Sequence, residues 1–159
     1  MAERAAGLRL ATLCYVRKHG RTLMLLRNRK KDDYHEGKYN GLGGKFEPGE
    51  SPEQCMRREV LEESGLHALK ARLNGMITFP TFDGTNDWYV FVYTITDTEG
   101  DLIDSDEGEL HWIDDDRLLG LNLWEGDRIF IPWLSRPGVF SARFVYDGPR
   151  LVSHEVDWY

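Results

Sequence analysis

Three glutamates, Glu59, Glu62 and Glu63, are the residues whose type and spacing most directly suggest chemistry. On an α-helix they occupy positions i, i+3 and i+4, so they share one face. Oxygen donors that converge in this way suit a hard divalent cation such as Mg2+. A solvated acidic surface with local salt bridges is the alternative, because runs of charge usually only solvate a face.

The sequence around the glutamates predicts a short helix that runs from about Pro52 to Ser64. A good N-cap residue, a proline at the first helical position, the glutamine of a capping box and a glycine just past the end mark its limits. These signals are Ser51, Pro52, Gln54 and Gly65.

The predicted helix places its glutamates at the negative end of the helix dipole. Each anion in the last turn there is unfavourable by roughly 0.3–1 kcal/mol. A positive partner is therefore expected, and Arg58, one turn before Glu62, is the nearest on the same helix.

The stretch from Gly43 to Leu66, GGKFEPGESPEQCMRREVLEESGL, resembles the sequence box of the Nudix hydrolase family, G-x5-E-x7-R-E-U-x-E-E-x-G-U, where U is aliphatic. Nine specified positions match at the correct spacing, which makes chance a poor explanation. They are Gly44, Glu50, Arg58, Glu59, Val60, Glu62, Glu63, Gly65 and Leu66.

The resemblance implies an enzyme that hydrolyses a diphosphate linkage, using Mg2+ with Mn2+ as the alternative ion. The catalytic residues that it implies are Arg58 and the proposed metal ligands, one of which, Glu59 or Glu107, takes a proton from water. Arg58 is expected to pair with Glu50. The implied ligands are the Gly43 carbonyl and the side chains of Glu59, Glu62, Glu63 and Glu107, the last in the SDEGELHW context.

A second run, YNGLGGK at Tyr39–Lys45, resembles WNGFGGK in Nudix enzymes that hydrolyse oxidised purine nucleoside triphosphates to monophosphate and pyrophosphate. The resemblance implies that Asn40 reads the base, although a turn residue is its alternative role. Those enzymes also carry a Trp-Pro-Asp-Asp run, and this chain has Trp124-Glu125-Gly126-Asp127, which keeps the tryptophan and one acid. Trp124 is therefore expected to pack on a purine, with a place in the core as its alternative.

The favoured substrate is thus a small nucleotide, an 8-oxo or ordinary purine nucleoside triphosphate. Its hydrolysis would serve to remove damaged nucleotides from the nucleotide pool (nucleotide-pool sanitation). ADP-ribose, a dinucleoside polyphosphate or a 5'-triphosphate RNA end remains an alternative substrate, and a non-catalytic nucleotide sensor an alternative class. Lys45 and Arg27 are expected to touch phosphates. Arg27 opens a polar loop, residues 27–40, that also holds Arg29, Lys30, Lys31 and Lys38.

The bulk composition fits one domain over residues 1–159, with a net charge of −7 that does not favour a nucleic-acid partner. No apolar run approaches the length of a membrane span, and the N-terminus lacks a signal-peptide core. Cys14 and Cys55 have no metal-site spacing, so both are expected to be core residues in a reducing compartment. The cytoplasm is the expected location, and the oligomeric state is open.

Alternating and apolar runs indicate the elements that must position these residues. Periodicity alone predicts a single α+β domain, and the Nudix resemblance implies an α/β fold, an α/β/α sandwich around a mixed β-sheet. Strands are expected at residues 8–16, 22–26, 75–82, 88–96, 109–113, 139–146 and 151–156, with helices at 52–64, 114–119 and 123–134.

Overall fold

A computed structural model describes residues 7–29 and 35–159 of the chain. These residues form an eight-stranded sheet in the order β3-β2-β1-β5-β4-β7-β8, with β6 paired to β2. The β1–β5 and β4–β7 pairs are parallel and the others antiparallel, so the sheet is mixed. The strands are β1 (Leu8–Lys18), β2 (Arg21–Leu26), β3 (Tyr39–Asn40), β4 (His67–Phe79), β5 (Asp87–Glu99), β6 (Glu109–Asp114), β7 (Phe140–Asp147) and β8 (Arg150–Trp158).

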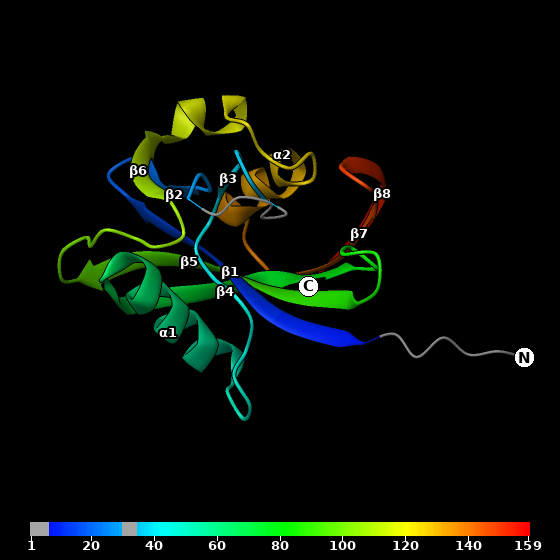
Figure 1. Ribbon diagram of the computed structural model, residues 1–159, viewed down its shortest axis with the longest axis horizontal. Coiled ribbons are helices and arrows are strands. Elements are labelled where there is room, and N and C mark those ends of the chain that lie inside the picture. The colour runs from blue at the N-terminus through cyan, green and yellow to red at the C-terminus, as the bar shows by residue number, and fades with distance from the viewer. Residues whose placement is uncertain (1–6, 30–34) are drawn as a thin grey trace, which may run out of the picture.

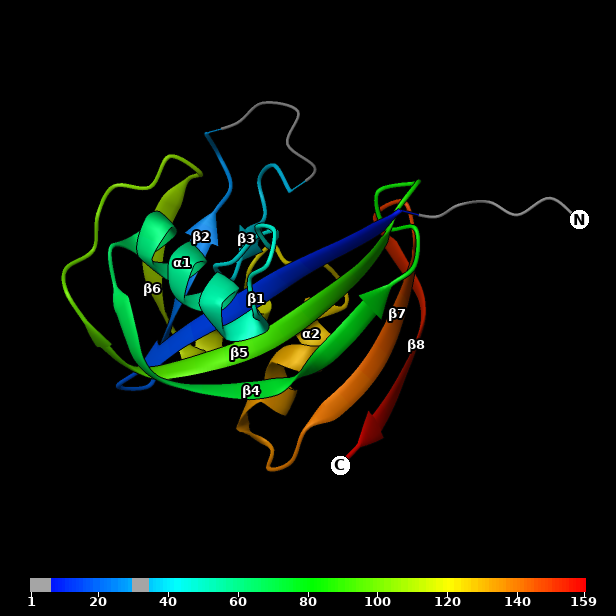
Figure 2. The ribbon, with the colours of Figure 1, turned by 90° about the horizontal axis from the view of Figure 1, so that it is seen from below.

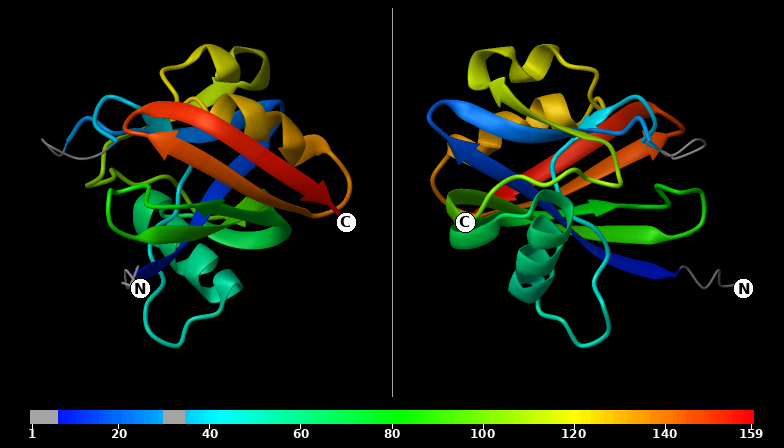
Figure 3. Two further views of the ribbon diagram at one scale, coloured as in Figure 1. Left: turned by 90° about the vertical axis from the view of Figure 1, so that its right-hand side faces the viewer. Right: turned by 60° about the vertical axis from the view of Figure 1, so that its left-hand side comes forward.

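Helices cover the strands from two sides, as Figures 1 and 3 show. The long helix α1 (Pro52–Ser64) lies on one side, and Figure 2 shows it crossing in front of β1 and β5. The other side carries the 3-10 helix η1 (Asp115–Gly120), α2 (Asp127–Phe130) and the 3-10 helix η2 (Ile131–Ser135). The expected α/β/α arrangement with a mixed sheet is confirmed.

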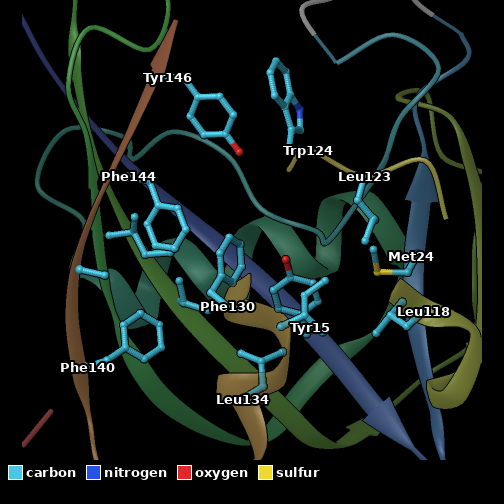
Figure 4. Packing of buried hydrophobic residues seen from close by; sticks show 14 residues of the cluster. Tyr15, Met24, Leu118, Leu123, Trp124, Phe130, Leu134, Phe140, Phe144 and Tyr146 are labelled. Atoms are coloured by element: carbon cyan, nitrogen blue, oxygen red, sulfur yellow. The ribbon is translucent and has the colours of Figure 1, made fainter. Parts of the chain in front are cut away.

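Each side of the sheet has its own apolar core because successive strand residues point to opposite faces. Cys14 and Leu23 face α1 and pack with its Met56. Tyr15 and Met24, the next residues along the same two strands, pack with the other helices. This second core includes a row of aromatic rings, among them Phe130, Phe144, Tyr146 and Trp124 (Figure 4).

Local signals determine both ends of α1, and the expected bounds are confirmed. The Ser51 side chain accepts a hydrogen bond from the Gln54 backbone N–H, and the Gln54 side chain accepts one from Ser51, which completes the capping box. At the other end Gly65 has φ 82°, a left-handed conformation that glycine adopts without a Cβ penalty.

Two expected elements differ from the structure. The helix expected at residues 123–134 is wrong in its start, because α2 covers only Asp127–Phe130 and passes into η2, where Pro132 lacks a backbone donor. The strand expected at 75–82 is β4, which runs from His67 to Phe79. Its first half was not predicted because β-bulges near Lys70 and Asn74 interrupt the period-two pattern there. Lys30, Lys31 and the N-terminal six residues lie outside the described residues.

Both cysteines are buried and free, as expected of core residues. In the described part of the chain, none of the helices has the length and apolar character needed to cross a membrane.

Candidate active site

A cavity of about 390 Å3 lies between α1, the glycine loop that precedes it, and the aromatic core on the other side of the sheet. Its volume is within the range of ordinary small-molecule sites, roughly 300–1,000 Å3. Nine of the eleven residues assigned to the site from the sequence line this cavity, and Arg58 and Glu62 do not. Those nine are Arg27, Asn40, Gly43, Lys45, Glu59, Glu63, Glu107, Trp124 and Asp127.

Glu63 is the most deeply buried carboxyl at the α1 end of the cavity, with 7% of its surface exposed. Its Oε1 accepts a hydrogen bond of 2.6 Å from the Gly43 backbone N–H. Burial nevertheless raises the pKa of Glu63 to about 8, with Glu59 and Glu107 adding to the increase. The ionised form of Glu63 therefore needs a positive partner in the cavity.

The glycine loop approaches β1 and α1 so closely that side chains are excluded. Gly43 has φ 127°, and a Cβ there would lie 2.1 Å from the Thr12 carbonyl oxygen. A Cβ on Gly44 would lie 2.8 Å from the Glu59 carboxylate. The two glycines thus bring backbone groups directly against the carboxylates of α1.

Arg58 ties the loop to the helix. Its Nε and Nη2 donate to both oxygens of Glu50, at 2.6 and 2.9 Å, which is the expected pairing. Its Nη2 also donates to the Lys45 carbonyl at 3.0 Å. The two hydrogen bonds from Arg58 hold the pKa of Glu50 well below its usual range, at about 2.

The remaining α1 carboxylates also contact Arg58, which donates to Glu59 at 2.7 Å and to Glu62 at 3.2 Å. Burial raises the pKa of Glu59, and Arg58 opposes the rise. The Glu62 side chain is 56% exposed and lies outside the cavity. The three glutamates share the acidic side of α1 as expected, but only Glu59 and Glu63 line the cavity.

Glu107 reaches the same end of the cavity from the loop just before β6. Its Oε2 accepts a hydrogen bond of 3.0 Å from Arg27 Nη1, at the end of β2. Its backbone N–H donates to the Ser105 hydroxyl at 3.2 Å. We call this region, lined by Glu59, Glu63, Glu107, Arg27 and Lys45, the acidic end of the cavity.

Aromatic rings form the other part of the cavity wall. Trp124 packs edge-on against Phe82 and Tyr146, at ring-centroid distances of 5.0 and 5.5 Å. Figure 4 shows Trp124 and Tyr146 next to each other at one border of the aromatic core. Phe79 packs against Phe82 at 5.6 Å. We call the region lined by Phe79, Phe82, Trp124, Asp127 and Tyr146 the aromatic end.

Two buried polar side chains accompany these rings. Burial raises the pKa of Asp127 to about 7, so this acid is partly protonated at neutral pH. Asn40 is 8% exposed, and its Nδ2 has no hydrogen-bond partner within the described residues. A buried unpaired donor is unfavourable by about 1–3 kcal/mol, so an acceptor atom of a bound molecule would stabilise the site by pairing with Asn40 Nδ2.

The two ends are electrostatically distinct. The side chains that shift the pKa of Glu63 are Glu59, Arg27 and Glu107. Those that act on the pKa of Asp127 are Arg128 and Lys38. The cavity therefore joins a strongly charged region to a mainly apolar one that holds a single neutralisable acid.

Sequence reasoning missed the aromatic partners of Trp124. Phe79 and Tyr146 belong to strands whose pattern looks like ordinary core, and Phe82 lies in the turn after β4. Trp88 and His35 also line the cavity and were not assigned to it. No local pattern marks these residues, because only the fold brings them to the cavity.

The acidic end fits a divalent cation by the chemistry of its donors. Carboxylate oxygens are the ligands that Mg2+ and Mn2+ prefer, and an ion would supply the positive charge that buried Glu63 needs. Within residues 7–29 and 35–159, no three carboxylate, imidazole or thiol groups have the arrangement to hold one ion. Arg58 and Arg27 instead engage the carboxylates of Glu59 and Glu107.

Sequence comparison gives relatives over nearly the whole chain. The family model of the NUDIX domain matches residues 7–134. The chain is 34% identical over 150 residues to an oxidized purine nucleoside triphosphate hydrolase of Danio rerio, covering 94% of each protein. It is 30% identical over 149 residues to the Mus musculus protein of the same name, covering 93% of this chain and 94% of the relative.

Comparison with solved structures also gives a similar protein over nearly the whole chain. The crystal structure of a mutator MutT protein from Bacillus halodurans matches with a TM-score of 0.83 at 30% identity. The match covers 94% of this chain and 97% of that protein.

Proposed function

Because the chain belongs to the NUDIX domain family and is a Nudix hydrolase, we propose that it hydrolyses purine nucleoside triphosphates, including 8-oxo forms, to nucleoside monophosphate and pyrophosphate. The observation that carries the proposal is the joined cavity, whose acidic end suits a metal-bound polyphosphate and whose aromatic end suits a flat base. The names of the zebrafish and mouse relatives support the same substrate class.

The phosphate chain belongs at the acidic end in this proposal. Glu59, Glu63 and Glu107, with the Gly43 carbonyl, would hold a divalent cation, for which Mg2+ is the first choice. When bound, such an ion neutralises phosphate oxygens and lowers the pKa of water. Nudix hydrolases generally use divalent ions.

Glu62 stays in the proposed ligand set, but its present partner is Arg58 at 3.2 Å. As a ligand, the Glu62 carboxylate would rotate away from that guanidinium. Arg58 would keep its bidentate contact with Glu50, and it would continue to hold the glycine loop against α1.

The chain's own groups then account for binding and proton transfer. Lys45 and Arg27 line the cavity and would contact phosphate oxygens with their charged side chains. The water oxygen bonds to the α- or β-phosphorus, the P–O bond of the bridge between these two phosphorus atoms breaks, and a carboxylate takes the water proton. The family resemblance makes Glu59 and Glu107 the two candidates for that step, and both line the cavity.

The base belongs at the aromatic end. Stacking of a base on an aromatic ring contributes roughly 1–3 kcal/mol, and Trp124 would supply that ring. The unpaired Nδ2 of Asn40 would donate to an acceptor on the base edge. Asp127, with its pKa raised to about 7, would either donate or accept there according to the base.

The test is product analysis with wild-type protein, Mg2+ and a panel of 8-oxo-dGTP, dGTP, ADP-ribose and diadenosine tetraphosphate. We expect monophosphate and pyrophosphate from the two triphosphates, and no turnover after chelation. Diphosphate and orthophosphate as products, or cleavage of ADP-ribose alone, would overturn the substrate assignment. Nucleotide binding without turnover would instead favour a sensor.

A further inference from the structure

His35 and Trp124 meet at the aromatic end of the cavity, although 89 residues separate them in sequence. The Trp124 indole Nε1–H donates to the His35 imidazole Nδ1 at 2.7 Å. The two rings lie edge-to-face, with centroids 5.5 Å apart and planes at 80°. Both side chains line the cavity.

This hydrogen bond defines the state of the histidine. An indole N–H is only a donor, so Nδ1 of His35 must carry a free lone pair. The imidazole is therefore neutral with its proton on Nε2. Among the other side chains, asparagine places an acceptor oxygen close to the position of Nδ1, whereas alanine places none.

The backbone around His35 is held to the backbone around Trp124. Asn122 Nδ2 donates to the Gly37 carbonyl at 2.8 Å, and the Tyr39 N–H donates to the Asn122 carbonyl at 2.9 Å. The Lys38 ammonium lies 5.0 Å from the Trp124 ring centroid. The hydrogen bond from Trp124 is thus one of several contacts between the same two segments.

Phe82, in the turn after β4, contacts both His35 and Trp124. Its ring lies nearly parallel to the His35 imidazole, with centroids 6.3 Å apart and planes at 21°. It also meets Trp124 edge-on at 5.0 Å. The indole therefore has a ring contact on Phe82 and a directional contact on His35, which together restrict its rotation.

We propose that His35 is a positioning residue that fixes the Trp124 indole in the orientation for stacking on a purine base. The inference rests on the proposed nucleotide function. Without the hydrogen bond, the indole would have to be ordered when the base binds, and ordering one side chain weakens binding. His35 acts through Trp124 and has no role in the chemical step.

The kinetic test uses His35→Ala, His35→Asn, Trp124→Phe and the double variant His35→Ala/Trp124→Phe with dGTP and 8-oxo-dGTP. We expect His35→Ala to raise KM by roughly 3- to 10-fold, the range of one partly buried hydrogen bond, with kcat unchanged. His35→Asn should restore most of the affinity. Once Trp124 is phenylalanine, which lacks the N–H, the alanine change should have little further effect.

His154→Ala is the matched control. His154 also stacks on a core aromatic, Phe144, at 5.2 Å, but it does not line the cavity. We expect this variant to keep the wild-type KM. An unchanged KM in His35→Ala would overturn the inference, because the contact would then serve only stability. Equal increases in the wild-type and Trp124→Phe backgrounds would overturn it too, because His35 would then act independently of Trp124.

A binding measurement separates this inference from the proposed function. The Trp124 indole N–H signal, identified by its loss in Trp124→Phe, should shift in His35→Ala and stay near wild type in His35→Asn. The Kd for dGMP, measured by calorimetry, should rise in the alanine variant while that for inorganic pyrophosphate does not. Failure of hydrolysis with these results would remove the proposed reaction but keep the positioning role, and an unmoved indole signal would remove the positioning role.

Discussion

The two ends of the cavity are built in different ways. The acidic end takes most of its groups from one run of sequence, Gly43 to Leu66. Arg27, just after β2, and Glu107, just before β6, complete it, and these two strands pair with each other. The aromatic end takes its residues from four separate places, namely β4 and the turn after it, the segment before α2, α2 itself and β7.

The difference shows which forces hold each end. Helix period, caps and glycine conformations place the carboxylates of α1, so their arrangement is mainly local. Sheet register and core packing place the rings, since Phe79 and Tyr146 come from β4 and β7, which pair side by side through Gly75–Thr78. We therefore expect changes at the acidic end to alter turnover, and changes at the aromatic end to alter affinity for the base.

Glu63→Gln should produce the largest effect. Glutamine keeps the acceptor for the Gly43 N–H and the volume of the side chain, but it removes the charge that a cation would need. We expect kcat to fall by roughly 10²–10³-fold, the scale of losing one electrostatic contact in a transition state, with KM for dGTP little changed. Steady-state kinetics and a circular dichroism check of the fold measure this.

Glu62→Gln is the comparison variant, because the Glu62 carboxylate lies outside the cavity on Arg58. A loss as large as that of Glu63→Gln would mean that Glu62 turns inward as a metal ligand in the active complex. A much smaller loss would restrict the ligand set to the residues that line the cavity. Near-wild-type turnover in Glu63→Gln would contradict the assignment of the acidic end.

Asp127 gives a test of the aromatic end through pH. Burial raises its pKa to about 7, so between pH 4 and pH 7 the folded protein binds more protons at this site than the unfolded chain does. Stability from this group is therefore full below about pH 4 and declines as pH rises to 7. At about 1.4 kcal/mol per pH unit, the loss is up to roughly 4 kcal/mol.

Urea unfolding at pH 5 and pH 8 measures this loss. Asp127→Asn should be more stable than wild type at pH 8 and much closer to it at pH 5. Glu63, whose pKa is raised to about 8, also lowers stability as the pH rises, but it does so in both proteins. The difference between wild type and Asp127→Asn therefore isolates Asp127. Equal losses in the two proteins would show that Asp127 is ionised at neutral pH despite its burial.

The local part of the molecule was largely predictable from sequence. Ser51, Gln54 and Gly65 placed the ends of α1, and the matched box implied the Glu50–Arg58 pair that the structure contains. The fold class also followed from the resemblance. A one-domain organisation and the catalytic and metal-binding roles remain predictions.

The rest depends on contacts between distant segments. The partners of Trp124 could not be read from sequence, because Phe82 and Tyr146 look like ordinary turn and strand residues. The exposed position of Glu62 could not be read either, since helical spacing places three carboxylates on one side without saying which of them the sheet covers. The helix expected at 123–134 was begun too early, because the apolar Leu123 and Trp124 precede α2, and η2 continues the turn beyond its end at Phe130.

Trp124→Ala should have the next largest effect, and it tests whether the aromatic end determines affinity for the base. Loss of base stacking at roughly 1–3 kcal/mol corresponds to a rise in KM of about 5- to 150-fold, with a small change in kcat. Trp112→Ala is the control, because Trp112 packs in the α1-side core and does not line the cavity. A fall in kcat with unchanged KM would mean that the two ends do not divide affinity and turnover between them.

Ser51→Ala should give the smallest effect, and it tests whether local structure alone places the carboxylates. The change removes the acceptor for the Gln54 N–H, so we expect the free energy of unfolding to fall by about 1 kcal/mol in urea titrations. Buried Met56 and Val60 also hold α1 on the sheet, so kcat should stay within a few-fold of wild type. Ser51→Asp restores a capping oxygen, adds a charge that the helix N-terminus favours, and should recover the lost stability. If Ser51→Ala raised the KM for purine nucleotides as well, the cap would influence rings that belong to other strands, and the two ends would not be separable.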